Sequence, residues 1–463
     1  MKLAIHNEVA VSNDEVRQLD RAYVFHSWSM QGNLNPLVIA GAQGCELWDY
    51  EGNTWLDFSS QLVNVNIGYQ HPRVLAAMKA QLETLVTIAP ATANLARGEA
   101  AKRIVDLAPA GFSKVFFTNA GADANENAIR MARLYTGRDK VLSAYRSYHG
   151  NTGSAIAATG DWRRVPNEFS RGHVHFFNPY LYRSEFNAAT EEEECQRALA
   201  HLRRIIECEG PTAIAAILLE SIPGTAGILV PPAGYMQGVR ALADEFGIVL
   251  ILDEVMAGFG RTGSWFAFEQ DGVVPDLVTF AKGVNAGYVP AGGVLISEPI
   301  ARYFDDHFFA GGLTYSGHPL AMAAIVATID AMKEEKVVEN AAYIGNEVLR
   351  PGLEALAEKH AIIGEVLRPG LEALAEKHAI IGEVRGRGLF QALELVSSRE
   401  QKTPLTAADM AAIKGALTEA GLLAFVVENR IHVVPPCTIT AEQVAQGLAI
   451  FDAVFARFAS LAK

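Results

Sequence analysis

The chain has 463 residues, of which half are apolar and 20% are charged, with 40 glycines. This composition is typical of a globular protein with many tight turns, and it excludes a disordered or fibrous chain. The formal net charge of −13, with no run rich in Lys and Arg, gives no general attraction to nucleic acid or to an anionic membrane. We therefore expect neither a nucleic-acid partner nor a membrane partner.

Other features of the sequence predict a cytoplasmic protein. No apolar run approaches the roughly 20 residues that a bilayer-spanning helix needs, and polar residues interrupt the N-terminus too early for a secretory signal. The four cysteines, Cys45, Cys195, Cys208 and Cys437, have neither disulfide nor zinc-site spacing. We expect reduced, mostly buried thiols and no metal site.

In chain order, the first predicted elements are short strands within residues 36–58, joined by a hairpin turn at 49–53. From about residue 100 to 300, apolar runs alternate with helical patterns. The predicted strands lie at 114–118, 140–144, 214–220, 248–252 and 277–281, and helices lie near 125–135 and 235–246. Strands this apolar are covered on both faces, which indicates an α/β fold with a mainly parallel sheet flanked by helices.

The two ends of the chain have a different pattern. The C-terminal third mixes helices with short strands, one of them near 383–389. We expect the N-terminal segment 1–70 and the C-terminal segment 326–463 to form a smaller α+β domain together. Residues 71–325 are then the large domain, and two domains suit a chain of this length.

One segment is duplicated. Residues 347–364 (EVLRPGLEALAEKHAIIG) recur without change at 365–382. A functional repeat array has at least three diverged units, so a tandem duplication without a function of its own, natural or engineered, is the better interpretation. The copy length equals about five helical turns, which would keep one buried face in a continuous helix. Pro369-Gly370 would fall inside such a helix and disfavours it.

Two polar residues close buried strands, and both are candidates for chemistry. Lys282 follows the strand at 277–281; a buried lysine has a lowered pKa, and its neutral amine can condense with an aldehyde. Asp253 follows the strand at 248–252, at the sheet edge where open α/β sheets bind ligands, and could keep a pyridine nitrogen protonated. The alternatives are a strand that simply emerges into solvent at Lys282 and a helix N-cap at Asp253.

Two further segments suit a phosphorylated, flat ligand. Residues 119–123 (NAGAD) join a strand to a helix with small side chains, so backbone amides can approach a phosphate closely. Tyr148, in Tyr148-His149-Gly150, offers an aromatic face for stacking on a ring. A plain turn and an ordinary core aromatic are the alternatives.

The run 258–263 (GFGRTG) matches the G-x-G-x-x-G dinucleotide fingerprint. That fingerprint directly follows its strand and opens a helix. Here Asp253 and Glu254 intervene, and residues 264–268 do not begin a helical pattern. A nicotinamide-dependent dehydrogenase is therefore only a remote alternative.

Together these segments resemble the class III aminotransferases of the fold-type-I pyridoxal-phosphate enzymes. The matching motifs run in order along nearly the whole chain: Leu56-Asp57, Asn119–Asn125, Tyr148-His149-Gly150, Glu220, Leu252–Gly263, Pro275–Gly283, Thr314–Pro319 and Gly386–Leu389. The resemblance implies pyridoxal 5′-phosphate as cofactor and a homodimer with its sites at the subunit interface.

The resemblance also implies roles for single residues. Lys282 would form the Schiff base and carry protons between the half-reactions, and Asp253 would pair with the pyridinium. Val255 would pack on the ring opposite Tyr148, beside His149 and Glu220. The phosphate would be bound by the amides of Gly121 and Ala122, and by Thr314 of the other subunit.

Two departures from the family concern anion binding. Ala120-Gly121-Ala122 stands where relatives often have Ser-Gly-Ser, so phosphate binding depends more on backbone amides. Phe425 stands where many relatives have an arginine for the substrate carboxylate, and the nearest arginine is Arg430.

Within the class, residues 26–29 and 58–66, which include Trp28 and Leu62, look like those of taurine–pyruvate and related ω-amine transaminases. We take Trp28, Leu62, Phe425 and Arg430 as candidate substrate residues. The expected reaction moves an amino group from a primary or ω-amine to pyruvate and forms alanine. An aminomutase or a decarboxylase of the same fold is the alternative.

Overall fold

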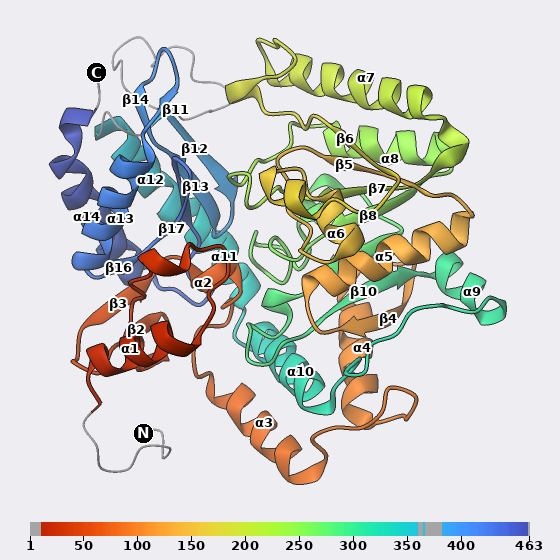
Figure 1. Cartoon of the computed structure of the whole chain (residues 1–463), viewed down its shortest axis with the longest axis horizontal. Coiled ribbons are helices and arrows are strands. Elements are labelled where there is room, and N and C mark those ends of the chain that lie inside the picture. Colours follow the sequence, from red (N-terminus) through yellow and green to blue (C-terminus); the bar gives the residue numbers. More distant parts are fainter. Residues whose placement is uncertain (1–10, 360–363, 366–381, 462–463) are drawn as a thin grey trace.

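The computed structural model describes residues 11–359, 364–365 and 382–461. Within them, a seven-stranded sheet forms the centre of the larger part of the molecule (Figure 1). Its order is β4-β10-β9-β8-β7-β5-β6, and of these strands β10 alone runs antiparallel to its neighbours. This confirms the predicted α/β fold. The strands are β4 Phe112–Thr118, β5 Lys140–Ala144, β6 His173–Phe176, β7 Ile214–Glu220, β8 Val249–Asp253, β9 Leu277–Phe280 and β10 Gly292–Ser297.

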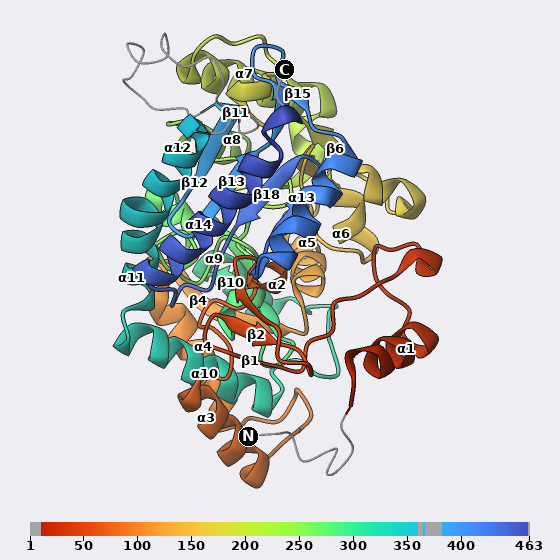
Figure 2. The same ribbon diagram turned by 90° about the vertical axis from the view of Figure 1, so that its left-hand side faces the viewer.

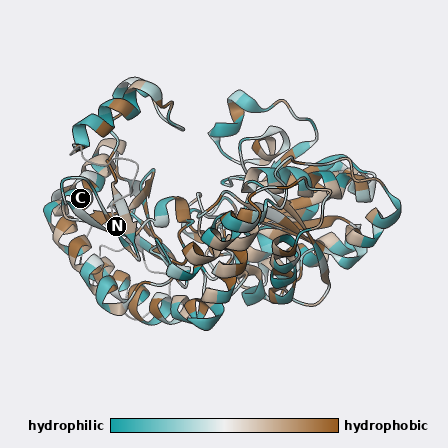
Figure 3. Ribbon diagram, turned by 90° about the horizontal axis from the view of Figure 1, so that it is seen from below, coloured by the Kyte–Doolittle hydropathy of each residue, from teal (hydrophilic) through white to brown (hydrophobic). Residues whose placement is uncertain are grey.

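Helices cover both faces of this sheet, which is why its central strands are mostly apolar. Ala216 and Leu218 of β7 pack toward α5, α6 and α9, while Ile217 and Leu219 pack toward α4, α7, α8 and α10. Figure 3 shows hydrophilic and hydrophobic bands around the peripheral helices. The helices of this part of the chain have the following bounds: α3 Pro72–Thr84, α4 Leu95–Leu107, α5 Gly121–Thr136, α6 Gly153–Ala158, α7 Glu191–Glu209, α8 Tyr235–Phe246, α9 Glu298–Asp306 and α10 Pro319–Glu334.

The described N-terminal and C-terminal segments lie in the same part of the molecule (Figures 1 and 2). Strand β16 near the C-terminus pairs in parallel with β3 near the N-terminus, Leu422 opposite Leu56. A further sheet has the order β11-β12-β13-β18-β17 in the described residues. The domain boundaries at 70 and 325 stay predictions.

The elements of these end segments have the following bounds: α1 Asn13–Tyr23, β1 Gly41–Gln43, β2 Glu46–Trp48, β3 Thr54–Asp57, α2 Ser60–Val63, α11 Val337–Tyr343, a π-helical turn Ile344–Leu349, α12 Arg350–Lys359, β11 Gly364–Glu365, β12 Gly382–Arg387, β13 Phe390–Glu394, β14 Val396–Ser398, β15 Thr403–Pro404, α13 Ala407–Glu419, β16 Leu422–Leu423, β17 Phe425–Val427, β18 Arg430–Val433 and α14 Ala441–Arg457.

Several predicted bounds agree with the structure and others need correction: strand β4 begins at Phe112 rather than at 114, and β9 ends at Phe280 rather than at 281. Strands β5 and β7 and helix α8 have the predicted bounds, and α8 ends at Gly247 with a left-handed φ of 61°, as a glycine C-cap does. Helix α5 begins at Gly121, earlier than predicted, so the expected phosphate turn is its first turn. Asp253 is the last residue of β8 rather than the residue after it.

Two expectations from composition have direct structural counterparts. None of the described helices is long and apolar enough to cross a membrane. All four cysteines are free; Cys45, Cys195 and Cys437 are buried and Cys208 is exposed.

The first duplicated copy provides helix α12. Pro351 is the second residue of α12, directly after the π-helical turn, and a proline is tolerated in a first turn. Gly364 and Glu365 at the junction of the copies pair in parallel with Gly382 and Glu383. Gly364 and Gly382, the last residues of the two copies, therefore lie next to each other, while Pro369-Gly370 lies outside the described residues.

Deletion of residues 365–382 is expected to keep transaminase activity and to leave the melting temperature equal or higher. It joins Gly364 directly to Glu383 and restores the same local sequence. A surface insertion costs little beyond loop closure, about 0.6 kcal/mol per doubling of loop length. Thermal unfolding and steady-state kinetics of the deleted chain provide the test. Loss of folding, or a strong shift in amine preference, would show that the duplication is a working part of the protein.

Candidate active site

The carboxyl ends of three neighbouring strands bring the main candidates together. Glu220 ends β7 opposite Asp253 at the end of β8, and Asp253 is opposite Thr279 of β9. Lys282 is two residues beyond the end of β9, at the start of a 3-10 turn that runs from Lys282 to Val284. The carboxyl ends of parallel strands lie at one edge of a sheet, so Asp253 and Lys282 both lie at the edge where open α/β sheets bind ligands.

Lys282 has an unusual backbone and an unusual amine. Its φ of 43° lies in the left-handed region that non-glycine residues seldom adopt, a form of strain found at functional sites. Burial lowers the pKa of Lys282 to about 8, although the carboxylates of Asp253 and Glu220 act in the opposite direction. The guanidinium of Arg261 adds to the lowering. At neutral pH this amine is therefore neutral far more often than a surface lysine is.

The rate at which the apoprotein captures added pyridoxal phosphate should follow this pKa. Only the neutral amine attacks an aldehyde, so the rate is expected to rise as the pH rises through about 8 and to level off above it. Stopped-flow absorbance across a pH series measures this. A rate that keeps rising beyond pH of about 10, as for an ordinary lysine, would contradict the perturbed amine.

A hydrogen-bonded network fixes the carboxylate of Asp253. Its Oδ1 accepts from the Val255 amide at 3.0 Å, and its Oδ2 accepts from His149 Nδ1 at 2.8 Å and from Asn125 Nδ2 at 2.7 Å. Thr279 donates its hydroxyl to Asn125 Oδ1 at 2.7 Å, which orients the Asn125 amide so that its nitrogen faces the carboxylate. All these side chains except Val255 are buried, and an ionised carboxylate with several donors is held firmly.

Sequence reasoning assigned no role to Asn125 or Thr279. Asn125 lies within the Asn119–Asn125 motif and Thr279 within the motif that ends at Gly283. Both residues therefore belong to segments that match the family, but the sequence predicts no task for either. His149, expected among the cofactor-binding residues, contacts the carboxylate of Asp253 through Nδ1, and its buried Nε2 has no hydrogen-bond partner among the described residues.

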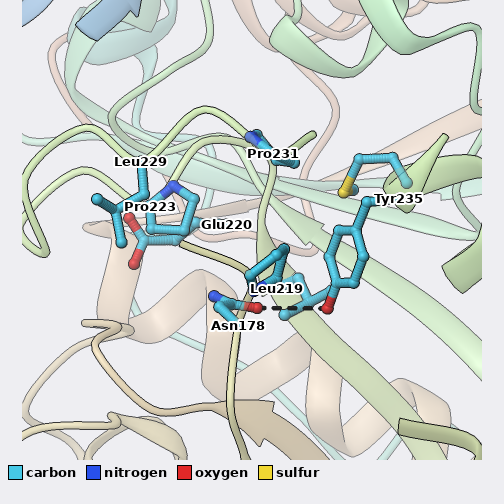
Figure 4. A pocket seen from close by; sticks show the side chains of 9 residues that line it. Asn178, Leu219, Glu220, Pro223, Leu229, Pro231 and Tyr235 are labelled. Carbon is cyan, nitrogen blue, oxygen red and sulfur yellow. Dashed lines mark hydrogen bonds between the residues drawn. The ribbon is translucent and has the colours of Figure 1, made fainter. Parts of the chain in front are cut away.

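Glu220 links the strand end to two loops. Its Oε1 accepts from the Tyr148 amide at 3.0 Å and its Oε2 from the Gly224 amide at 2.7 Å. Burial raises the pKa of Glu220 to about 7, and the charge of Asp253 adds to this. A pocket behind Glu220 has a volume of about 10 Å³, which suits one water molecule rather than a cofactor. Figure 4 shows the residues that line this pocket, where the Tyr235 hydroxyl donates to Asn178 Oδ1 at 3.5 Å.

The first turn of α5 has the form of an anion site. Ala120 is its N-cap and makes no side-chain capping bond, which leaves first-turn amides available to a phosphate. A Cβ on Gly121 would lie 2.8 Å from Val255 Cγ2, and a Cβ on Gly150 would lie 2.5 Å from Ala122 Cβ. Glycines at 121 and 150 thus allow the close approach of Val255 and Ala122.

Aromatic side chains surround Tyr148. The edge of the Trp28 ring meets it with centroids 6.0 Å apart, and the Arg163 guanidinium lies 4.1 Å from the Tyr148 centroid. Trp28 is 59% exposed. Trp28 therefore lies beside Tyr148 and is accessible from solvent.

The other predicted substrate and phosphate residues lie on separate elements of the fold. Leu62 is exposed in α2, and Thr314 is exposed between α9 and α10; in the described part of the chain neither makes a hydrogen bond to Lys282 or Asp253. Phe425 and Arg430 lie on the adjacent strands β17 and β18.

The glycine-rich run 258–263 holds a buried arginine. Arg261 is fully buried and donates to Asn66 Oδ1 at 2.7 Å, to Ser60 Oγ at 3.2 Å and to the carbonyl oxygen of Pro435. After the run the chain enters a short 3-10 turn, Ala267–Asp271, not the helix that a dinucleotide site needs. The nicotinamide interpretation has no structural support here.

The donor set around Lys282 fits pyridoxal phosphate. A low-pKa amine, a fixed carboxylate and uncapped helix amides lie on connected elements, and each matches one functional group of that cofactor: the aldehyde, the pyridine nitrogen and the phosphate. The unpartnered Nε2 of His149 lies on the same network.

Comparison with known proteins gives a consistent result. The family described as Aminotransferase class-III matches residues 29–371 and 354–455. The two matches overlap at 354–371, a stretch as long as one duplicated copy. The chain is 34% identical over 422 residues to a taurine–pyruvate aminotransferase of Rhodobacter capsulatus (87% of each chain) and 32% identical over 424 residues to one of Bilophila wadsworthia (88% of each).

A solved structure is more similar. The taurine:2-oxoglutarate aminotransferase of Bifidobacterium kashiwanohense, in complex with pyridoxal phosphate and glutamate, is 42% identical with a TM-score of 0.90. The match covers 97% of this chain and 99% of that one.

Proposed function

The chain belongs to the class III aminotransferases, which use pyridoxal phosphate, and from this premise we propose that it moves an amino group from a taurine-like ω-amine or another primary amine to pyruvate, forming alanine. The taurine–pyruvate aminotransferases at 32% and 34% identity support this substrate pair. The geometric observation that carries the proposal is the low-pKa amine of Lys282 beside the fixed carboxylate of Asp253.

Lys282 and Asp253 perform the central tasks in this proposal. Pyridoxal phosphate, when bound, supplies an electron-accepting ring that acidifies the α-hydrogen of the amine. Lys282 Nζ holds the cofactor between turnovers and, when displaced by substrate, takes the α-proton and returns it during the second half-reaction. Asp253, oriented by the hydrogen bonds from His149 and Asn125, holds the proton on the pyridine nitrogen.

The surrounding residues bind and orient. The amides of Gly121 and Ala122 bind the phosphate together with Thr314 of a second subunit, and Tyr148 and Val255 pack on the two faces of the ring. Glu220 holds the Tyr148 backbone in place through its 3.0 Å hydrogen bond.

A second acceptor is supported by one observation. The solved relative at 42% identity is a taurine:2-oxoglutarate aminotransferase in complex with glutamate, so 2-oxoglutarate is the alternative to pyruvate here.

A matrix of amine donors and keto-acid acceptors tests both forms of the proposed reaction, the one with pyruvate and the one with 2-oxoglutarate. The purified holoenzyme is incubated with taurine, β-alanine or propylamine and with pyruvate or 2-oxoglutarate, and the amino acid product is quantified. Alanine supports the first form and glutamate the second. Consumption of amine without either product would instead indicate a decarboxylase or an aminomutase and would overturn the proposal.

We also propose a homodimer in the cytoplasm. The loop that carries Thr314 has large apolar side chains in solvent, Phe308 at 90% and Tyr315 at 62% exposure, and exposed apolar groups of this size favour an interface. Trp28 and Leu62, at 59% and 61% exposure, are proposed to line the substrate path at this interface, with Phe425 near it.

A further inference from the structure

One face of the small sheet carries buried nitrogen atoms that the reaction described above does not use. Arg385 of β12 is opposite Ala392 of β13, and Ala392 is opposite His432 of β18. Side chains directly opposite each other share a face of a sheet, and Arg430 shares it because it is two residues from His432. Val384, which precedes Arg385, and Ile431, which lies between Arg430 and His432, face the other way into the apolar core of the C-terminal segment.

This face packs against the loops that follow the catalytic strands. Ala392 belongs to a buried apolar cluster with Ile222, two residues after Glu220, and with Ala257, four residues after Asp253. Val63 and the partly buried Met256 and Phe425 complete the contact. The small sheet therefore borders the candidate active site with the face that carries Arg430 and His432.

The nitrogen atoms on this face are buried and lack partners. His432 has no exposed surface, and neither of its ring nitrogens has a partner within the described residues. The same holds for Arg430 Nε and Arg385 Nη2. Most buried polar atoms in proteins are hydrogen-bonded, so a group of unpartnered ones in one place indicates a missing ligand.

The charges favour an anion as that ligand. Arg385 is already engaged, because its Nη1 contacts Glu383 at 2.5 Å and Glu394 at 3.2 Å and its Nε donates to the Gly227 carbonyl at 2.5 Å. Arg430 is paired with Glu428; the Arg430 side chain is 13% exposed and that of Glu428 is 65% exposed, so the carboxylate can turn away into solvent while the guanidinium stays in place. Arg430 is thus the cation that can exchange partners.

His432 suits the same ligand as a donor. Burial holds the pKa of His432 well below its usual range, and the charges of Arg430, Arg385 and Lys282 act in the same direction. A neutral imidazole has one N–H to donate. The influence of Lys282 also places His432 within electrostatic reach of the catalytic amine.

Gly227 brings the loop after β7 directly against the two arginines. A Cβ at this position would lie 2.6 Å from Arg430 Cδ and 2.6 Å from Arg385 Nη2, and Gly227 has a left-handed φ of 119°. The loop that starts at Glu220 therefore reaches the arginine pair without a side chain between them.

We propose that Arg430 and His432, with Arg385 behind them, form a subsite that binds the anionic group of the substrate, a carboxylate or a sulfonate. The inference rests on the proposed function and specifies how that site holds its substrates. A guanidinium and an imidazole N–H supply charge-assisted hydrogen bonds to such a group. Phe425, whose ring meets His432 edge-on at 5.0 Å, provides the apolar wall of the subsite.

The test measures the two half-reactions separately in Arg430→Gln, by the absorbance of the bound cofactor in holoenzyme. Amine donors are taurine, β-alanine and the uncharged-tail propylamine; acceptors are pyruvate and 2-oxoglutarate. We expect the apparent dissociation constant to rise at least tenfold for one or more substrates that carry an anionic group, at a nearly unchanged limiting rate. The propylamine reaction should stay within about twofold of the parent. Arg302→Gln, an exposed arginine of α9 that pairs with Glu298, is the matched control and should change nothing.

The pattern of weakened substrates identifies which anion the subsite holds. If only the binding of taurine is weakened, the subsite binds the sulfonate of the donor. If the binding of both keto acids is weakened, the subsite binds the α-carboxylate. If only the binding of 2-oxoglutarate is weakened, the subsite binds its distal carboxylate. Arg430→Lys, which keeps the charge, should recover part of the loss. Equal weakening of propylamine, or no change for any anionic substrate, would overturn the proposal. If Arg430→Gln does not fold, His432→Gln takes its place with the same expected pattern. Continued turnover of propylamine shows that the proposed function stands even when the subsite fails.

Discussion

Replacement of Lys282 by alanine is expected to abolish transamination in a protein that remains folded. In the proposed function the Lys282 amine both holds the cofactor covalently and moves the proton, and general acid–base catalysis alone contributes about 10²- to 10⁴-fold. We therefore expect a loss in kcat of at least about 10⁴-fold. Alanine removes a partly buried cation whose pKa is already lowered by burial, so the fold should tolerate the change.

Steady-state turnover and thermal unfolding measure the two parts of this expectation. Lys114→Ala is the matched control, because Lys114 lies on the outer part of the same sheet in β4 and pairs with the exposed Asp305 at 3.2 Å. That variant should keep full activity. Turnover of Lys282→Ala at a rate near that of the parent would remove the basis of the site assignment.

Asp253→Asn is expected to retain some cofactor yet to lose most activity. An amide cannot stabilise the protonated pyridine nitrogen. Its NH₂ group would also face an N–H donor in either orientation: the Val255 amide, which now donates to Oδ1 at 3.0 Å, or His149 and Asn125, which now contact Oδ2 at 2.8 Å and 2.7 Å. At least one hydrogen bond that now holds the side chain is therefore lost together with the charge.

Single-turnover conversion of the bound cofactor by an amine is the appropriate measurement, because it isolates chemistry from product release. Asp271→Asn provides the control: this carboxylate pairs with Arg387 at 3.0 Å and lies in the turn Ala267–Asp271, outside the network. If the Asp253→Asn rate stays within about tenfold of the parent, roughly 1.4 kcal/mol of barrier, Asp253 does not have the proposed role.

The apolar runs made the large sheet predictable. Strands β5 and β7 have the predicted bounds because each is a short run buried on both faces and closed by polar residues. The order of β7, β8 and β9 across the sheet could not be predicted from the chain, yet their consecutive positions in a parallel fold made adjacency the natural expectation. For this reason the ends of the apolar strands predict Asp253 and Lys282 at the ligand-binding edge, whereas Glu220 was implied only by the family resemblance.

Contacts between segments far apart in the chain were not predictable in the same way. Asn125 reaches Asp253 across 128 positions and Thr279 reaches Asn125 across 154, and no local pattern marks such a bond. The arrangement of Arg385 and His432 depends on the register of three strands. Sequence reasoning had singled out Arg430 only by its distance from the family's arginine position, and it did not consider His432.

Peptide mass spectrometry of the borohydride-reduced holoenzyme tests the central claim most directly. Reduction makes the bond between a lysine and pyridoxal phosphate permanent, so the modified residue can be sequenced. We predict one phosphopyridoxyl group per chain, carried by Lys282 and absent from the Lys282→Ala protein. A stable group on another lysine, or none on an enzyme that still transaminates, would contradict the account.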